Sequence, residues 1–295
     1  MSNKKQKTIL VTGGAGFIGS HLCERLVRGL PAQAGGHKVI SLDNYFTGSK
    51  DNHVEGVEYR EGHTKDIEKY IPETPDIIYH LGEYSRVERS LEEPDLVWDL
   101  NKDGTFGVLE FWRKKKPKLI YAGSSTKFGD GGLGRDQSPY AWTKASNTEL
   151  VCNYGRWYGL PHAVAYFYNV YGPGERSGKY GTLIEIFRQK FVSRESLTVV
   201  SPGTQKRNFT HVDDIVDGLI LVGESGEGDD FGLGDSREYS VLEIAKMFGG
   251  KIEMLPERPG NRMSSSIDTS KSEALGWSPK RNILEYIEKI CSNPA

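Results

Sequence analysis

A glycine-rich turn between a strand-like and a helix-like segment constrains the fold of this chain more than any other feature. Residues 7–12 form a short β-branched apolar run, and Gly13-Gly-Ala-Gly16-Phe-Ile-Gly19 follows it directly. Residues 21–27 then have helical spacing. Gly13 permits a tight turn, Gly16 lets the main chain approach a pyrophosphate, and Gly19 allows close packing of helix on strand. The segment therefore predicts the first strand–turn–helix unit of a dinucleotide-binding sheet.

The alternation of strand and helix continues along the chain of 295 residues. Further strands are predicted at residues 37–42, 57–60, 76–81, 118–122, 163–168 and 197–200. Helical patterns separate most of them, which favours a parallel sheet with helices on both faces. We expect an α/β fold, a Rossmann-type doubly wound parallel sheet with a smaller C-terminal α/β substrate subdomain. The predicted domains are 1–168 and 169–295, with residues 205–222 returning to the first domain.

An acidic residue ends the second predicted strand. Asp43 lies 24 residues after Gly19, where a carboxylate can accept hydrogen bonds from the hydroxyls of an adenine-linked ribose. The same carboxylate would repel a 2′-phosphate, so the pattern favours NAD over NADP. The alternative interpretation is that Asp43 serves only as a turn residue at the end of the strand.

A second group of polar residues follows the fifth predicted strand. Ser124 comes just after that strand, and Tyr140 and Lys144 are four residues apart, so they share one face of a helix. A lysine ammonium near a phenol lowers the phenol pKa, and a phenol tuned in this way can take a proton from a sugar hydroxyl. The alternative is an ordinary exposed helix. In this order after a dinucleotide motif, however, we expect the three side chains to converge.

Composition excludes several other classes of function. The 38 Lys and Arg residues are balanced by 40 Asp and Glu residues, so no basic excess exists to bind nucleic acid. Three widely spaced cysteines, with no Cys/His cluster, predict neither disulfides nor a metal site and fit a reducing compartment. No apolar run of 18 residues suggests a membrane span. We therefore expect a cytoplasmic protein.

Several motifs together resemble the extended short-chain dehydrogenase/reductases that act on nucleotide sugars. The resemblance covers nearly the whole chain and is highly specific for family, but less so for reaction. After the glycine motif and Leu42-Asp43-Asn44, the matching segments are Tyr79-His-Leu81, Ser138-Pro-Tyr-Ala-Trp-Thr-Lys144, Tyr168-Asn-Val-Tyr-Gly-Pro173, Gly203-Thr-Gln-Lys-Arg207, Phe209-Thr-His-Val-Asp-Asp214, Arg258-Pro-Gly260, Asp268-Thr-Ser-Lys271 and Leu275-Gly-Trp-Ser-Pro279.

The resemblance implies a tightly held NAD and transient oxidation of a sugar carbon, usually C4, to a ketone. Dehydratases and decarboxylases of this family carry a carboxylate in the turn that here holds Ser124, Ser125 and Thr126. Because this turn has only hydroxyl residues, it is similar to that of UDP-hexose 4-epimerases, and we expect a nucleotide-sugar 4-epimerase.

Glu83 leaves an alternative open. Relatives commonly have small residues at this position, so Glu83 is either an ion-pair partner of Arg86 or the base of a nucleotide-sugar 4,6-dehydratase. A second departure is His63, where the family usually has Asp at the adenine edge. A third hypothesis, an NAD-binding sensor or scaffold without turnover, is disfavoured by the three residues expected to converge.

The residue assignments follow from the motifs and the resemblance. The expected catalytic residues are Ser124 with Tyr140 and Lys144. The residues expected to contact NAD are Gly13, Gly16, Phe17, Ile18, Gly19, Asp43, Asn44, Asp66, Ile67, Leu81, Gly82, Asn101, Tyr140, Lys144 and Phe167. The residues expected to contact the nucleotide sugar, with UDP favoured, are Glu83, Ser124, Ser125, Asn169, Arg207, Arg258 and Arg262.

Oligomeric state is also implied by the resemblance. Residues 96–112 and 141–158 carry several large apolar side chains. In relatives the matching helices form a four-helix dimer interface, so we expect a homodimer. The alternative is that these side chains belong to the core of a single subunit.

Overall fold

The computed structural model describes residues 6–29, 36–125, 134–167, 169–256 and 268–293. A seven-stranded sheet with the order β11-β6-β5-β4-β1-β2-β3 forms its centre, and every pairing within this sheet is parallel. Its strands are β1 (Thr8–Thr12), β2 (Lys38–Asp43), β3 (Val57–Glu61), β4 (Ile77–His80), β5 (Lys118–Ala122), β6 (His162–Phe167) and β11 (Gly228–Leu233). The expected Rossmann-type sheet is confirmed.

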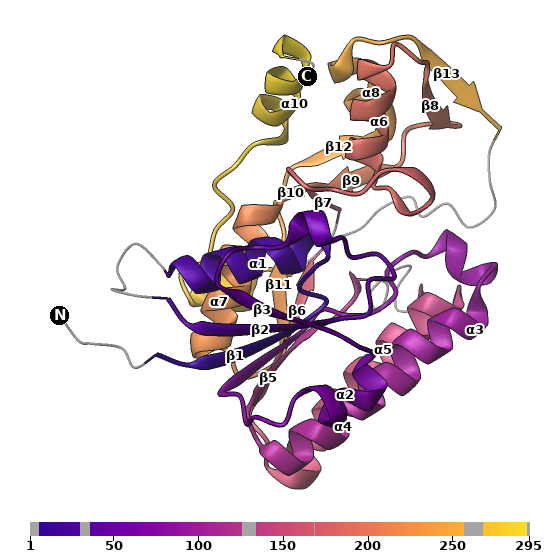
Figure 1. Cartoon of the computed structure of the whole chain (residues 1–295). Coiled ribbons are helices and arrows are strands. Elements are labelled where there is room, and N and C mark those ends of the chain that lie inside the picture. The colour runs from indigo at the N-terminus through magenta and orange to yellow at the C-terminus, as the bar shows by residue number, and fades with distance from the viewer. Residues whose placement is uncertain (1–5, 30–35, 126–133, 168, 257–267, 294–295) are drawn as a thin grey trace.

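Helices cover both faces of the sheet (Figure 1). On one face lie α1 (Phe17–Arg28) and α7 (Val212–Ser225), and on the other lie α2 (Ile67–Tyr70), α4 (Gly104–Lys115) and α5 (Pro139–Tyr158). Successive residues of β1 alternate between the two cores: Ile9 and Val11 pack towards α1 and α7, whereas Leu10 packs towards α4 and α5. The short helix α3 (Pro94–Val97) and a π-helical turn, Trp98–Asp103, precede α4.

The chain returns to the sheet through α7, which begins within the predicted range of residues 205–222 and packs in the core on one face of the sheet. Strand β11 follows, pairs with β6 and ends at Leu233, beyond that range. Helix α9 (Ser270–Ala274) packs beside β11, and Trp277 joins the same core. Strand β11 was not predicted from the sequence, because it begins with a glycine and two aspartates and these residue types are rare in strands.

The C-terminal subdomain lies above the carboxyl edge of the sheet (Figure 1). A third core, separate from those of the large sheet, holds its elements together. Its strands are β7 (Val170–Tyr171), β8 (Leu197–Val200), β9 (Lys206–Asn208), β10 (Thr210–His211), β12 (Glu238–Ser240) and β13 (Ile252–Leu255), and its helices are α6 (Leu183–Val192), α8 (Val241–Phe248) and α10 (Ile283–Ser292). Short turns of 3-10 helix include Lys50–Asn52, Thr64–Asp66, Glu88–Leu91 and Gly178–Tyr180.

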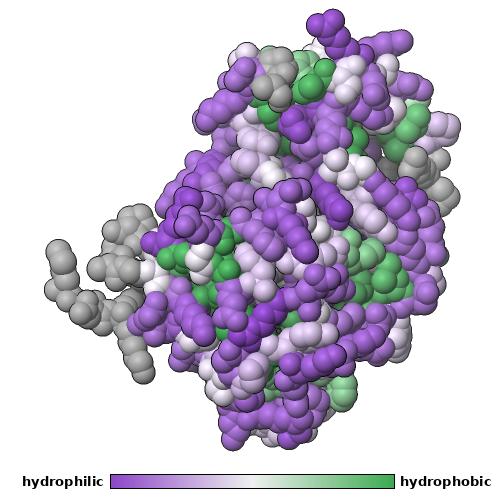
Figure 2. All heavy atoms as spheres, in the orientation of Figure 1, coloured by the Kyte–Doolittle hydropathy of each residue, from purple (hydrophilic) through white to green (hydrophobic). Residues whose placement is uncertain are grey.

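The surface is mostly hydrophilic on the face shown in Figure 2, with hydrophobic side chains in small patches. Within the described residues, every helix is too short or too polar to cross a membrane. Large hydrophobic side chains are fully buried mainly in the cores on the two faces of the sheet and in that of the subdomain. The sheet and its cores therefore form a rigid platform below the subdomain.

Truncation of Leu233 tests whether β11 belongs to the main core. Leu233 is fully buried, whereas Met254 on the small-sheet strand β13 is 45% exposed. We expect Leu233→Ala to lower the free energy of unfolding by about 2–5 kcal/mol, because it leaves a cavity. Met254→Ala should cost less than about 0.5 kcal/mol. Denaturant titration measures both, and equal losses would contradict the assignment of β11.

Candidate active site

A cavity of about 790 Å³ lies between the carboxyl edge of the sheet and the C-terminal subdomain. Its size is ample for a small-molecule site. Most of the residues expected to contact NAD or substrate line it, namely Gly13, Gly16, Phe17, Ile18, Gly19, Asp43, Asn44, Leu81, Gly82, Glu83, Ser124, Ser125, Tyr140, Lys144, Phe167, Asn169 and Arg207. The structure thus gathers residues from both predicted domains around one space.

In the glycine loop, the main chain of Gly13, Gly16 and Gly19 lines this cavity. Gly13 has φ +75°, and a Cβ placed there would lie 2.8 Å from the Cα of Gly82. A Cβ at Gly19 would lie only 2.0 Å from the carbonyl oxygen of Gly13. A side chain at Gly13 or Gly19 would therefore collide with the main chain, and the positive end of the α1 dipole faces the cavity. This loop fits the pyrophosphate of a dinucleotide.

Asp43 lies where the sequence predicts a ribose contact. Its carboxylate accepts hydrogen bonds from the main-chain N–H groups of Ala15, at 2.9 Å, and Tyr45, at 2.8 Å. The side chain is almost fully buried yet lines the cavity. Burial raises its pKa, while the two amide hydrogen bonds act in the opposite direction. The loop and Asp43 together fit the adenosine half of NAD.

Tyr140 and Ser124 meet as the sequence predicts. Ser138 caps α5 by accepting a hydrogen bond from the N–H of Ala141 at 3.1 Å, and this cap places Tyr140 in the first turn. The Tyr140 hydroxyl donates to Ser124 Oγ at 3.1 Å. Both side chains line the cavity, so a phenol and a hydroxyl face the same space.

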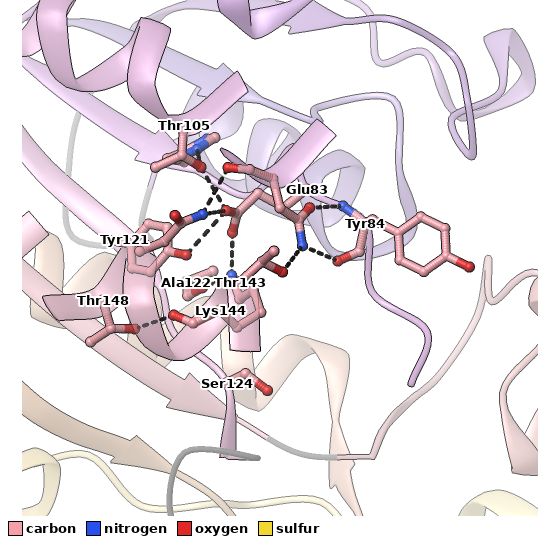
Figure 3. Close-up of polar contacts among 12 residues, drawn as sticks. Glu83, Tyr84, Thr105, Tyr121, Ala122, Ser124, Thr143, Lys144 and Thr148 are labelled. Carbon is pink, nitrogen blue, oxygen red and sulfur yellow. Dashed lines mark hydrogen bonds and ion pairs between the residues drawn. The ribbon is translucent and has the colours of Figure 1, made fainter. Parts of the chain in front are cut away.

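Lys144 is bound by the buried carboxylate of Glu83 (Figure 3). Its Nζ donates to Glu83 Oε2 and to the carbonyl oxygen of Ala122. The Lys144 side chain is 6% exposed and that of Glu83 is 3% exposed. We considered an ion pair between Glu83 and Arg86, but the Glu83 side chain points towards α5 and pairs with Lys144.

Glu83 accepts hydrogen bonds from three further side chains. Thr105 donates at 2.6 Å, Asn147 at 2.9 Å and Tyr121 at 3.1 Å, all to Oε1. Burial acts to raise the pKa of Glu83, but Lys144 and the other neighbours outweigh it and hold that pKa below its ordinary value. The carboxylate therefore stays ionised and is occupied on both oxygens.

A chain of hydrogen bonds extends from this carboxylate to the glycine loop. Thr105, which donates to Glu83, lies 3.0 Å from His80 Nε2, and His80 Nδ1 lies 2.7 Å from the Thr12 hydroxyl. The Thr12 hydroxyl also accepts from the N–H of Gly82. Burial lowers the pKa of His80 to about 4, so the ring is neutral at physiological pH. Because Thr105 donates to Glu83, Nε2 carries the proton of His80.

The pKa of Tyr140 differs from our expectation. We expected Lys144 to lower it, but it is raised, first because the phenol is buried and further because of the negative charge of Glu83. The hydrogen bond to Ser124 and the charge of Arg86 act to lower it. The reason for the difference is that the Lys144 charge is already paired with Glu83.

Several predicted residues lie elsewhere. Ile67 is buried in the core between the sheet and α4, and Asp66 lines a separate surface groove with it, so neither lines the main cavity. Their contact with NAD therefore stays a prediction. Asn101 lies behind the site and accepts from the N–H of Tyr84 at 2.7 Å. Arg258 and Arg262 lie outside the described residues, as does Thr126.

Sequence reasoning missed other residues that line the cavity. Arg86, Arg176, Tyr180 and Thr182 all face it. Arg86 donates through Nε and Nη2 to the carbonyl oxygen of Tyr180, at 2.8 and 2.6 Å. The glycine-rich loop that holds Tyr180 carried no pattern that would indicate this contact. The described residues contain no group of three or more His, Cys, Asp or Glu side chains able to hold a metal ion.

Comparisons with known proteins agree with this geometry. A putative UDP-glucose 4-epimerase of Methanocaldococcus jannaschii is 30% identical over 96% of each chain. UDP-glucuronic acid decarboxylase 1 of Xenopus tropicalis is 30% identical over 98% of this chain and 72% of its own. The structure of a UDP-glucose 4-epimerase of Thermus thermophilus in complex with NAD has a TM-score of 0.85 and 27% identity, covering 97% of this chain and 98% of the other.

The family profile gives the assignment. The profile of the NAD dependent epimerase/dehydratase family matches residues 9–234, which include the whole central sheet except the first residue of β1. That match agrees with the glycine loop and Asp43, which together fit NAD. This chain is therefore a member of the NAD-dependent epimerase/dehydratase family, and NAD is its cofactor.

Proposed function

We propose that this protein is a nucleotide-sugar 4-epimerase that acts through a transient 4-keto sugar, with UDP-sugars as the favoured substrates. The observation that carries the proposal is the hydrogen bond from Tyr140 to Ser124, at 3.1 Å, inside the cavity that also holds the glycine loop. Relatives named as UDP-glucose 4-epimerase support the choice of substrate and reaction.

Each residue of the site has its own role in the proposed reaction. When bound, NAD supplies a hydride acceptor for the sugar carbon and returns the hydride later. Tyr140 takes the proton of the sugar hydroxyl as that hydride leaves and gives it back in the reverse step, while Ser124 shares the proton. Lys144 holds the nicotinamide ribose, and Asn169 and Arg207, with Arg258 and Arg262, contact the nucleotide diphosphate. An arginine suits this task because its planar fork makes paired hydrogen bonds to phosphate.

The state of Glu83 favours epimerisation over dehydration. A 4,6-dehydratase needs a base that reaches a carbon-bound proton of the sugar, and we considered Glu83 for that role. Its carboxylate oxygens are bound by Lys144, Thr105, Asn147 and Tyr121, and its pKa is held low. Such a group is a weak base with no free oxygen aimed at the sugar. Other relatives are named UDP-glucuronic acid decarboxylases. A lyase reaction is therefore the alternative that the experiments below must exclude.

We also propose a homodimer formed through α4 and α5 and the π-helical turn before α4. Trp98 is 50% exposed, Phe106 is 54% exposed, and Trp98 stacks on Trp142 with ring centroids 5.9 Å apart. Large exposed aromatic side chains on one face mark interaction surfaces.

Cys23, Cys152 and Cys291 are free, which fits a reducing compartment, and the cytoplasmic location remains a prediction.

The first test is the reaction itself. The purified protein should interconvert UDP-glucose and UDP-galactose, or their N-acetyl forms, without added NAD, because the bound cofactor is regenerated in each cycle. Chromatography and mass spectrometry of the products measure this outcome. A product lighter by one water, or loss of carbon dioxide from UDP-glucuronic acid in a parallel incubation, would refute the epimerase proposal in favour of a lyase.

Removal of the Tyr140 hydroxyl tests the proposed base. Tyr140→Phe should lower kcat by roughly 10²–10⁴-fold, which is the usual contribution of a positioned acid or base. The matched control Tyr158→Phe, at the exposed end of the same helix, should keep kcat near that of the unaltered protein. A Tyr140→Phe variant with normal turnover would show that another group moves the proton.

A charge placed on the aromatic face tests the dimer. Phe106→Lys should convert a particle of two chains into one of a single chain, because a buried ammonium opposes association. Met254→Lys, on the distant strand β13, is the control and should leave the dimer intact. Light scattering after size-exclusion chromatography measures the mass, and a single-chain mass for the unaltered protein would contradict the proposal.

A further inference from the structure

Residues 172–182 form a bridging loop between β7 and α6, and one carboxylate joins the two ends of this loop. Glu175 Oε1 accepts a hydrogen bond from the main-chain N–H of Gly172 at 2.8 Å, and Oε2 accepts from the Thr182 hydroxyl. These partners are the first and the last residue of the bridging loop. Compact loops of this length, with their ends close together, are packed by their own side chains and often have a function.

The bridging loop reaches from the subdomain to three segments around the central sheet. Near its start, His21 on α1 donates through Nε2 to the carbonyl oxygen of Pro173 at 2.8 Å, because a carbonyl oxygen can only accept. Further along, Arg176 donates to the carbonyl oxygen of Phe46, in the loop after β2, at 3.5 Å. The third segment lies between β4 and α3, and its contacts are more extensive.

Most contacts of this third segment converge on Glu93. Its two carboxylate oxygens accept from the Tyr180 hydroxyl at 3.1 and 3.0 Å, and it forms an ion pair with Lys179. The same carboxylate accepts from the hydroxyl of buried Tyr84 at 3.0 Å. Lys179 and the two tyrosines hold the pKa of Glu93 below its ordinary value, although desolvation acts to raise it. Ionised Glu93 therefore joins two residues of the bridging loop to the segment after β4.

Three aromatic rings pack together at the same place. Phe46 stacks on Tyr84 with ring centroids 5.9 Å apart, and it meets the edge of Tyr180 at 5.3 Å. The rings of Tyr84 and Tyr180 are in edge contact at 6.3 Å. All three rings line the cavity. They close one side of it, and Glu93 holds two of them by their hydroxyl groups.

We propose that Glu93 is a positioning residue that keeps the bridging loop closed over the cavity and so slows exchange of the bound NAD. The inference needs NAD as the cofactor but not the 4-epimerase reaction. The three contacted segments also carry the glycine loop, Asp43 and Gly82, which line the NAD side of the cavity. Opening of the bridging loop would therefore uncover that side. Hydrogen bonds to a charged group are stronger than neutral ones, so closure depends on Glu93 more than on any single neutral contact.

The test is the rate at which the cofactor leaves the purified protein. The protein is loaded with NADH and mixed with excess NAD, and the loss of the fluorescence of bound NADH gives the rate constant of release. Glu93→Ala should raise this rate constant roughly 10–100-fold, the effect expected for lost hydrogen bonds to a charged group. Unchanged release from Glu93→Ala would overturn the inference.

An exchange of charges separates a role in closure from a general loss of stability. Glu93→Lys and Lys179→Glu each place like charges opposite one another, so each should speed release. The double variant Glu93→Lys/Lys179→Glu restores an ion pair, and a tyrosine hydroxyl can accept from a lysine as well as donate to a carboxylate. Its release rate should return close to that of the unaltered protein. A double variant as fast as the single variants would contradict the proposal.

Hydrogen exchange followed by mass spectrometry measures opening of the bridging loop without any cofactor. In Glu93→Ala, peptides from residues 172–182 should exchange faster, because the bridging loop has lost its charged contact. Peptides from β1, β4 and β5 should exchange as they do in the unaltered protein. Faster exchange across the central sheet as well would show that Glu93 supports the fold in general, and the specific role would be refuted.

The matched control is Glu92→Ala. Glu92 is the adjacent carboxylate, and it pairs with Arg89 three residues before it. Release and exchange in this variant should match those of the unaltered protein, and equal acceleration in Glu92→Ala and Glu93→Ala would overturn the inference. None of these measurements uses a sugar, so a failed epimerase assay would leave the inference intact, and failure of the inference would leave the epimerase proposal intact.

Discussion

The ion pair between Glu83 and Lys144 joins the elements on which the site is built. Glu83 follows β4, Lys144 lies on α5, Ala122 ends β5 and Thr105 lies on α4. Two charges out of water cost several kcal/mol unless hydrogen bonds satisfy them, and here five contacts do so. The geometry of the carboxyl edge of the sheet therefore depends on this pair staying closed. Tyr140, one turn before Lys144, is held in place by the same helix.

This pair also changes what each side chain contributes to proton transfer. A lysine next to a tyrosine on one helix face is expected to lower the pKa of the phenol, yet the phenol of Tyr140 is buried and its pKa is raised. Arg86, on the loop after β4, is joined to the subdomain by hydrogen bonds to the carbonyl oxygen of Tyr180.

Much of the fold and part of the site could be predicted from the sequence, because local patterns carried the information. Gly13, Asp43 and Ser124 each lie at or just after the end of a strand of a parallel sheet, and the carboxyl ends of such strands meet at one edge. The pairing of Glu83 with Lys144 spans 61 residues and depends on donors from two other elements, α4 and β5, as well as from α5, so no local pattern encodes it. Strand β11 was missed because glycine and aspartate, which begin it, are rare in strands.

In the proposed reaction the sugar is oxidised only at C4, and hydride returns there from the bound cofactor. Incubation with UDP-glucose in D₂O, followed by proton NMR of the sugar, is the most direct test of this reaction. We expect conversion to the 4-epimer with no deuterium at C4 or C5, because no side chain takes a proton from carbon. Deuterium at a ring carbon, or a changed product without inversion at C4, would contradict it.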